Sequence, residues 1–189
     1  MKHQPKWLLA LIAALALPPS AALAEASPPD QARAAVQALA ATLKGELMAA
    51  MQSGGPVAAI EVCNTRAPAI AEAVSLEQGV EVSRVSLKNR NPDNAPSDWQ
   101  RDVLLQFEER KAAGEDPAAL VWSDTVATAE GDQFRFMKAI PTGGLCLNCH
   151  GKTLAPAVAE KIAERYPNDQ ATGYREGDIR GAFVVTNTR

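Results

Sequence analysis

Apolar positions in the first part of the chain follow helical spacing. Between residues 27 and 55 they recur every three or four residues, at Val36, Leu39, Leu43, Leu47 and Met51. This spacing predicts an amphipathic helix that begins near Pro29 and ends at the Gly54–Gly55 pair, because proline suits a first helical turn and glycine ends a helix.

Three further segments also have helical spacing. Residues 56–76 form a second helical stretch, which we expect to be interrupted or restarted near Pro68, because proline is tolerated only in the first turn of a helix. A third helix, ending at Gly114, is predicted from apolar residues spaced four apart, namely Trp99, Val103 and Phe107. A short helix is predicted over about residues 155–165, before Pro167.

The strand-like segments lie mostly in the second half of the chain. Residues 80–87 alternate between apolar and polar side chains, which predicts a strand, and the Pro- and Asn-rich residues 88–97 predict a loop. Residues 119–127 and 132–142 are interpreted as a strand pair, and residues 179–186 as a last strand. Helices come first and antiparallel strands follow, so the predicted fold class is α+β, with one domain and no internal repeat.

The N-terminus has the pattern of a secretory signal peptide. Lys2 and Lys6 precede the apolar run of residues 7–17, and the small-x-small pattern Ala22–Leu23–Ala24 follows. Eleven apolar residues are too few for a membrane span, which needs about 20. We therefore expect residues 1–24 to be cleaved and residues 25–189 to form a periplasmic domain without stable membrane insertion.

Charge excludes several classes of partner. Removal of residues 1–24 takes away Lys2 and Lys6 and no acidic residue, so the net charge changes from −3 to −5. A mildly acidic domain lacks the basic footprint of proteins that bind nucleic acid or anionic lipid. No nucleic-acid partner is expected, and the sequence gives no oligomeric state.

The segment "CLNCH" carries the clearest chemistry of the chain. A C-x-x-C-H run is the attachment motif of c-type haem, in which the two cysteines form thioethers and the histidine ligates the iron. Here these residues are Cys146, Cys149 and His150. A structural zinc site would need two more Cys or His ligands, and only Cys63 remains in the expected mature chain. The motif occurs once, so one haem c is expected.

The second axial ligand of such a haem is left open by composition. His3 is the only other histidine and would leave with the signal peptide, which excludes two histidine ligands. The candidates are Cys63, a lysine or tyrosine, no ligand at all, or a methionine: Met48, Met51 or Met137. Methionine is more often a core filler, and a free cysteine is often a small buried hydrophobe. Thiolate is nevertheless an established haem ligand.

Four longer segments carry a family resemblance: "EVCNTRAPAIA", "SRVSLKNRNPDNAPSDWQ", "AIPTGGLCLNCHG" and "YPNDQATGYREGDIRGAFVV". In this order they resemble a family of single-haem c-type proteins with a PAS-like fold, found as exported proteins and as sensor parts of kinases and chemoreceptors. The resemblance implies N-terminal helices packed with an antiparallel sheet. It also implies axial ligation of the haem iron by His150 and Cys63.

Other polar and aromatic residues have weaker assignments. Arg66, Arg84 and Arg90 are candidates for contacts with the haem propionates, since guanidinium matches carboxylate in a bidentate way. Each of them could instead be an ordinary surface or ion-paired arginine. The aromatic side chains are expected in the core or the haem wall, namely Trp99, Trp122 and Tyr174.

These observations favour a haem protein that acts in electron transfer or in redox or gas sensing. Its expected partner is a redox partner protein or a small gas. The alternative is a haem enzyme of peroxidase type with an open distal site. That alternative needs a distal base, and no histidine besides His150 is left in the expected mature chain. An enzyme is therefore the less favoured hypothesis.

Overall fold

The computed structural model describes residues 26–188. The predicted signal peptide, residues 1–24, lies outside the described residues. Among residues 26–188, no helix combines the length and the apolarity that crossing a membrane requires.

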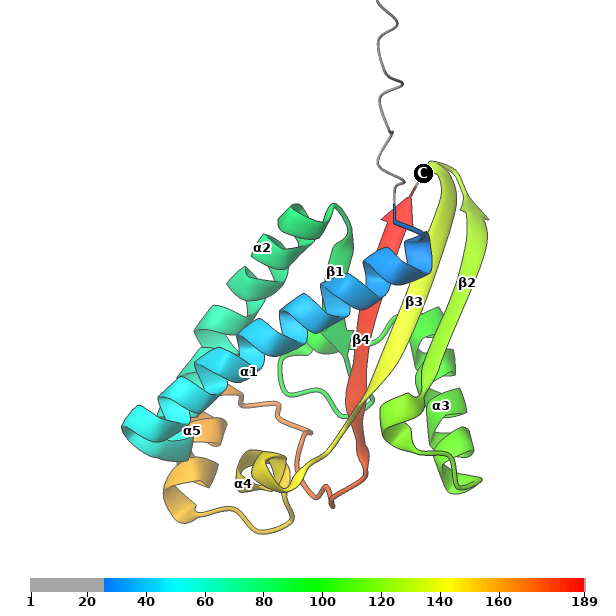
Figure 1. Ribbon diagram of the computed structural model, residues 1–189. Helices are drawn as coiled ribbons and strands as arrows, with labels where there is room; N and C mark the ends of the chain where they lie inside the picture. The colour runs from blue at the N-terminus through cyan, green and yellow to red at the C-terminus, as the bar shows by residue number, and fades with distance from the viewer. Residues whose placement is uncertain (1–25, 189) are drawn as a thin grey trace, which may run out of the picture.

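The centre of the fold is a four-stranded antiparallel sheet with the strand order β1-β4-β3-β2. The strands are β1 (Glu81–Val85), β2 (Val121–Thr128), β3 (Gly131–Pro141) and β4 (Ile179–Thr188). The long helix α1 (Pro28–Glu61) crosses one face of this sheet, and α3 (Asp98–Ala112) lies on the other side (Figure 1). The predicted α+β class is confirmed.

Helix α1 contains the break that the glycine pair predicts. Gly55 has φ 69° and ψ −165°, a backbone conformation that only glycine adopts at little cost, and Pro56 begins a new helical turn directly after it. The helical path then passes through a π-helical turn, Val62–Arg66, into α2 (Ala67–Gln78). The predicted irregularity near Pro68 is therefore present.

The two faces of the sheet carry separate apolar clusters, because side chains alternate along each strand. The face under α1 and α2 packs Phe136 and Val185 against helical residues, chiefly Ala35, Val36, Leu39, Ile70 and Val74. The other face packs the next residues of the same strands, Met137 and Val184, against α3 residues Val103, Leu104 and Phe107.

The last helices lie at one end of the sheet, below α1 in Figure 1. Helix α4 (Leu147–His150) follows β3 after a register shift at Ile140/Pro141, and α5 (Pro156–Arg165) follows α4. Such an irregularity bends a strand and redirects the chain that follows. A third cluster joins α5 to the end of α1 through Ile60, Val158, Ile162 and Tyr166.

Two neighbouring leucines of α3 test this packing. Leu104 is 1% exposed and Leu105 is 48% exposed. We expect Leu104→Ala to lower the free energy of unfolding by about 2–5 kcal/mol, because it removes buried methyl groups and leaves a cavity. Leu105→Ala should change it by less than about 0.5 kcal/mol. Urea denaturation of both variants measures the difference, and equal effects would contradict the placement of α3.

Candidate haem site

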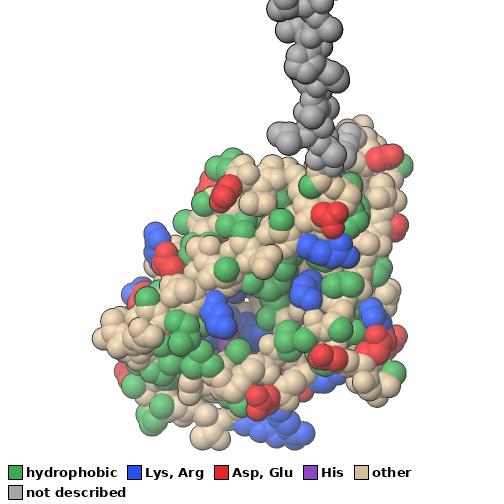
Figure 2. Space-filling model, viewed as in Figure 1, with side chains coloured by type: hydrophobic (Ala, Val, Ile, Leu, Met, Phe, Trp, Pro, Cys, Tyr) green, Lys and Arg blue, Asp and Glu red, His purple; other side chains and the backbone are tan. Residues whose placement is uncertain are grey.

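A cavity of about 360 Å³ lies between α1, the π-turn, the end of β1 and the segment that carries "CLNCH". Its volume falls within the range of small-molecule sites, about 300–1,000 Å³. Apolar side chains form much of its wall: Leu43, Leu47, Met51, Ile60, Val62, Ile140, Leu145 and Phe183. Figure 2 shows the molecular surface hollowed below α1, with basic side chains around the hollow.

The C-x-x-C-H segment borders this cavity with all three of its chemical groups. Cys146, Cys149 and His150 all line it. A short 3₁₀ turn (Gly144–Cys146) and α4 form this segment, which ends at Gly151. A Cβ atom at Gly151 would lie 2.6 Å from the Leu147 carbonyl oxygen, so the tight end of α4 requires glycine there.

His150 is held as a neutral imidazole, with Nδ1 as its donor nitrogen and Nε2 as its acceptor nitrogen. Its Nδ1 lies 2.7 Å from the Ala171 carbonyl oxygen and donates to it, which leaves the lone pair on Nε2. Burial, together with the nearby positive charges of Arg180 and Arg90, lowers the pKa of His150 to about 3. Metal-ligating histidines characteristically donate their second N–H to a carbonyl in this way.

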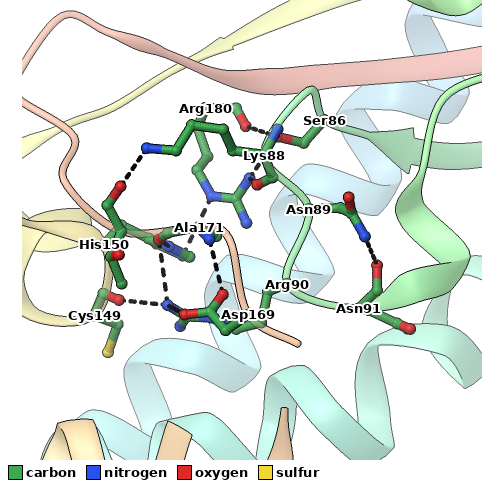
Figure 3. A network of polar contacts seen from close by, with 11 residues as sticks. Ser86, Lys88, Asn89, Arg90, Asn91, Cys149, His150, Asp169, Ala171 and Arg180 are labelled. Atoms are coloured by element: carbon green, nitrogen blue, oxygen red, sulfur yellow. Dashed lines mark hydrogen bonds and ion pairs between the residues drawn. The ribbon is translucent and has the colours of Figure 1, made fainter. Parts of the chain in front are cut away.

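Arg90 forms hydrogen bonds with the backbone in and near the C-x-x-C-H segment. Its Nε and Nη2 donate to Asp169 Oδ1 and Oδ2 at 3.0 and 3.1 Å, and this ion pair is buried. Nη2 also donates to the Cys149 carbonyl at 2.7 Å and to the Ala171 carbonyl at 3.3 Å (Figure 3). These protein partners engage Arg90, although it also lines the cavity.

The other two predicted arginines lie in different surroundings. Arg66 is exposed and forms a bidentate ion pair with Glu46 at 2.7 and 3.1 Å, and it is not among the cavity-lining residues. Arg84 lines the cavity and is half-buried, and its partial desolvation lowers its pKa. Within residues 26–188, the Arg84 side chain has no hydrogen-bond or ion-pair partner.

Arg180 is a cavity residue that the sequence reasoning missed. It donates to Ser86 Oγ at 2.9 Å and to the Lys88 carbonyl at 3.3 Å, and its Nε lies 3.4 Å from His150 Nε2 (Figure 3). Burial lowers its pKa. The sequence feature that could have indicated Arg180 is its position as a lone charged residue at the start of the otherwise apolar strand "IRGAFVV".

Cys63 enters the same cavity from the π-turn. The alternative interpretation of Cys63 as a small buried hydrophobe is wrong, because its side chain is exposed. Among the methionines, Met51 also lines the cavity. Met137 is fully buried on the α3 face, and Met48 is not among the lining residues.

The aromatic residues divide between the core and the site. Trp99 and Trp122 pack against the cluster on the α3 face, with their ring centroids 5.8 Å apart. Tyr174 is buried, and its ring meets His150 edge-on with centroids 6.2 Å apart. Tyr174 N–H donates to the His150 carbonyl oxygen at 2.9 Å. The predicted core or wall positions are consistent with these contacts.

Comparison with known proteins identifies the family and the fold of the chain. The model of the Tll0287-like family matches residues 21–187. The chain belongs to the Tll0287-like family. A solved structure similar to it is that of the cyanobacterial heme-protein Tll0287, with 26% sequence identity and a TM-score of 0.63. The alignment covers 87% of this chain and 98% of that one. No curated protein matches the chain.

The family assignment confirms the resemblance found in the sequence. The helices and antiparallel sheet of this Tll0287-like protein have the fold of the cyanobacterial structure. Among the described residues, no three His, Cys, Asp or Glu side chains are grouped as ligands of a metal ion.

The buried Arg90–Asp169 pair should matter far more for stability than an exposed pair. Asp169→Asn leaves an oxygen that can accept from the Ala171 N–H but strips Arg90 of its counter-charge. We expect a loss of about 3–5 kcal/mol in the free energy of unfolding, the cost of leaving a buried charge unpaired.

Glu115→Gln is the matched control for that variant, since it breaks the exposed Arg110–Glu115 pair. Its expected cost is at most about 1 kcal/mol. Thermal or urea denaturation compares the two variants. Similar losses in both would contradict the structural role given to Arg90.

Proposed function

We propose that this Tll0287-like protein binds one haem c in the cavity below α1 and acts in electron transfer or in redox or gas sensing. The observation that carries the proposal is the meeting of four groups on one apolar cavity: Cys63, Cys146, Cys149 and His150. The heme-protein Tll0287, which shares the fold, supports a haem as the ligand.

The residues fit the chemistry of a covalently attached haem. Cys146 and Cys149 would form the thioethers, and His150 would ligate the iron through Nε2, which carries the lone pair because Nδ1 donates to Ala171. Iron binding there would replace the contact of Nε2 with Arg180 Nε. Cys63 would supply the second axial ligand as a thiolate, which favours the ferric state because it carries a full negative charge. The bound haem would supply one-electron redox chemistry.

Half-buried positive charge in the cavity supports a ligand with carboxylates. Arg84 and Arg180 both line the cavity, and neither has a carboxylate partner among the described residues. We assign the haem propionates to Arg84 in the first place, with Arg180 as a second donor. Arg90 and Arg66, which already have carboxylate partners, are weaker candidates for that contact.

Two occupied axial positions favour electron transfer or sensing over peroxidase catalysis. A peroxidase needs an open iron face with a distal base, and no histidine other than His150 and His3 occurs in the sequence. A periplasmic location would suit a redox partner protein there, and a sensor would bind a small gas when the bond to Cys63 loosens. The response of the ferrous protein to carbon monoxide separates these two functions.

The attachment of the haem is directly testable. Because thioethers are covalent, we expect the haem to stay with the protein through acid–acetone extraction and denaturing electrophoresis. Cys146→Ala or Cys149→Ala should leave a single linkage or apoprotein, which the pyridine haemochrome spectrum detects. Release of all pigment from the wild type on denaturation would contradict c-type attachment.

The identity of the second axial ligand is tested by Cys63→Ala. We expect the low-spin ferric spectrum to change to a high-spin one, and carbon monoxide to bind faster after reduction, because the sixth position opens. Met51→Leu is the control, since Met51 is a methionine that lines the same cavity. Its optical and electron paramagnetic resonance spectra should equal those of the wild type. Spectral loss in Met51→Leu with an unchanged Cys63→Ala would reverse the assignment.

A further inference from the structure

The turn that carries Cys63 is a π-helical turn inside an otherwise α-helical path. Ala67 N–H donates to the Val62 carbonyl oxygen, five residues back, whereas an α-helix bonds four residues back. Helical residues precede this turn up to Glu61 and follow it from Ala67. Single π-turns are rare in proteins and occur frequently at functional sites.

Pro68 gives a local reason for the turn. A proline inside an α-helix has no N–H for the carbonyl four residues back, and its ring clashes with that carbonyl. For Pro68 that carbonyl belongs to Asn64, within the π-turn. The wider turn lets Pro68 occupy the second position of α2, where a proline is accommodated.

The π-turn also sets how the two helical halves face the protein. One additional residue in a turn shifts the phase of everything after it by about 100°, the angle per residue of an α-helix. Before the turn, Ile60 packs on α5 through Val158 and Ile162. After it, Ile70 and Val74 pack on the sheet in a different cluster. Cys63 lies between these two packed halves and faces the cavity.

Ion pairs fix both ends of the turn. Glu61, just before it, accepts from Lys161 at 2.9 Å and from Arg165 at 2.8 Å, both on α5. Arg66, its last residue, pairs with Glu46 of α1. Exposed or half-exposed ion pairs contribute little stability individually. They can orient the turn, but the proline is the feature that excludes regular α-helical bonding.

We propose that Pro68 is a positioning residue, which keeps residues 62–66 in the π-turn and thereby directs Cys63 at the haem site. This inference rests on the proposed ligation by Cys63. Without the ring, an N–H returns at position 68 and the turn can close to α-helical bonding. Cys63 then changes its direction relative to the cavity.

The test is Pro68→Ala in the full-length holoprotein, beside Cys63→Ala. Alanine favours a helix, so Pro68→Ala should fold, with a resistance to heat at or below that of the wild type because closing the turn also shifts the packing of α2. Its ferric form should nevertheless show a high-spin component, as Cys63→Ala does, and should bind added imidazole faster than the wild type. Pro29→Ala is the matched control, because Pro29 also occupies the second position of a helix, α1, and is not among the cavity-lining residues. It should leave the spectrum unchanged.

The outcomes separate the two claims. A wild-type spectrum in Pro68→Ala, with a changed one in Cys63→Ala, would overturn the role of Pro68 and leave the ligation intact. An unfolded Pro68→Ala would also overturn it, because the proline would then serve folding rather than the direction of Cys63. An unchanged Cys63→Ala would refute the ligation itself, and with it the inference.

Discussion

The structure of the site depends on one buried ion pair, between Arg90 and Asp169. Through it, a loop that follows β1 is tied to the loop after α5, and the same guanidinium binds the carbonyls of Cys149 and Ala171. Ala171 in turn accepts from His150 Nδ1. Three segments far apart in the sequence thus determine one imidazole orientation. Because both charges are buried, losing either partner would leave the other unpaired, at a cost of several kcal/mol.

Charge and polarity divide the cavity into regions with different roles. Aliphatic side chains of α1 and the strands provide an apolar wall suited to a flat macrocycle, whereas the half-buried Arg84 and Arg180 bring positive charge without carboxylate partners among the described residues. An apolar body with two carboxylates satisfies both regions at once. The same positive charges help to keep His150 neutral, which is the form that a metal ion requires.

The sequence predicts the parts of this structure that depend on local pattern. Periodicity located the helices and strands, and Gly55 and Pro68 marked the irregularities of the helical path, because their backbone constraints are local. The C-x-x-C-H motif identified Cys146, Cys149 and His150 for the same reason. The partners of the arginines could not be predicted, since they come from tertiary contacts: Arg66 meets Glu46, Arg90 meets Asp169, and Arg180 reaches the site through the antiparallel pairing of β1 with β4. Composition made Cys63 one of several candidates for the second axial ligand, and the longer family resemblance singled it out, because a lone cysteine has no local signal.

The central claim is that His150 and Cys63 ligate one haem iron. Iron K-edge X-ray absorption of the ferric holoprotein tests it most directly, because it counts the atoms bound to the metal. The account predicts one sulfur and five nitrogen neighbours, with the sulfur retained in Met51→Leu and lost in Cys63→Ala. A first shell without sulfur in the wild type, or a sulfur that survives Cys63→Ala, would contradict it.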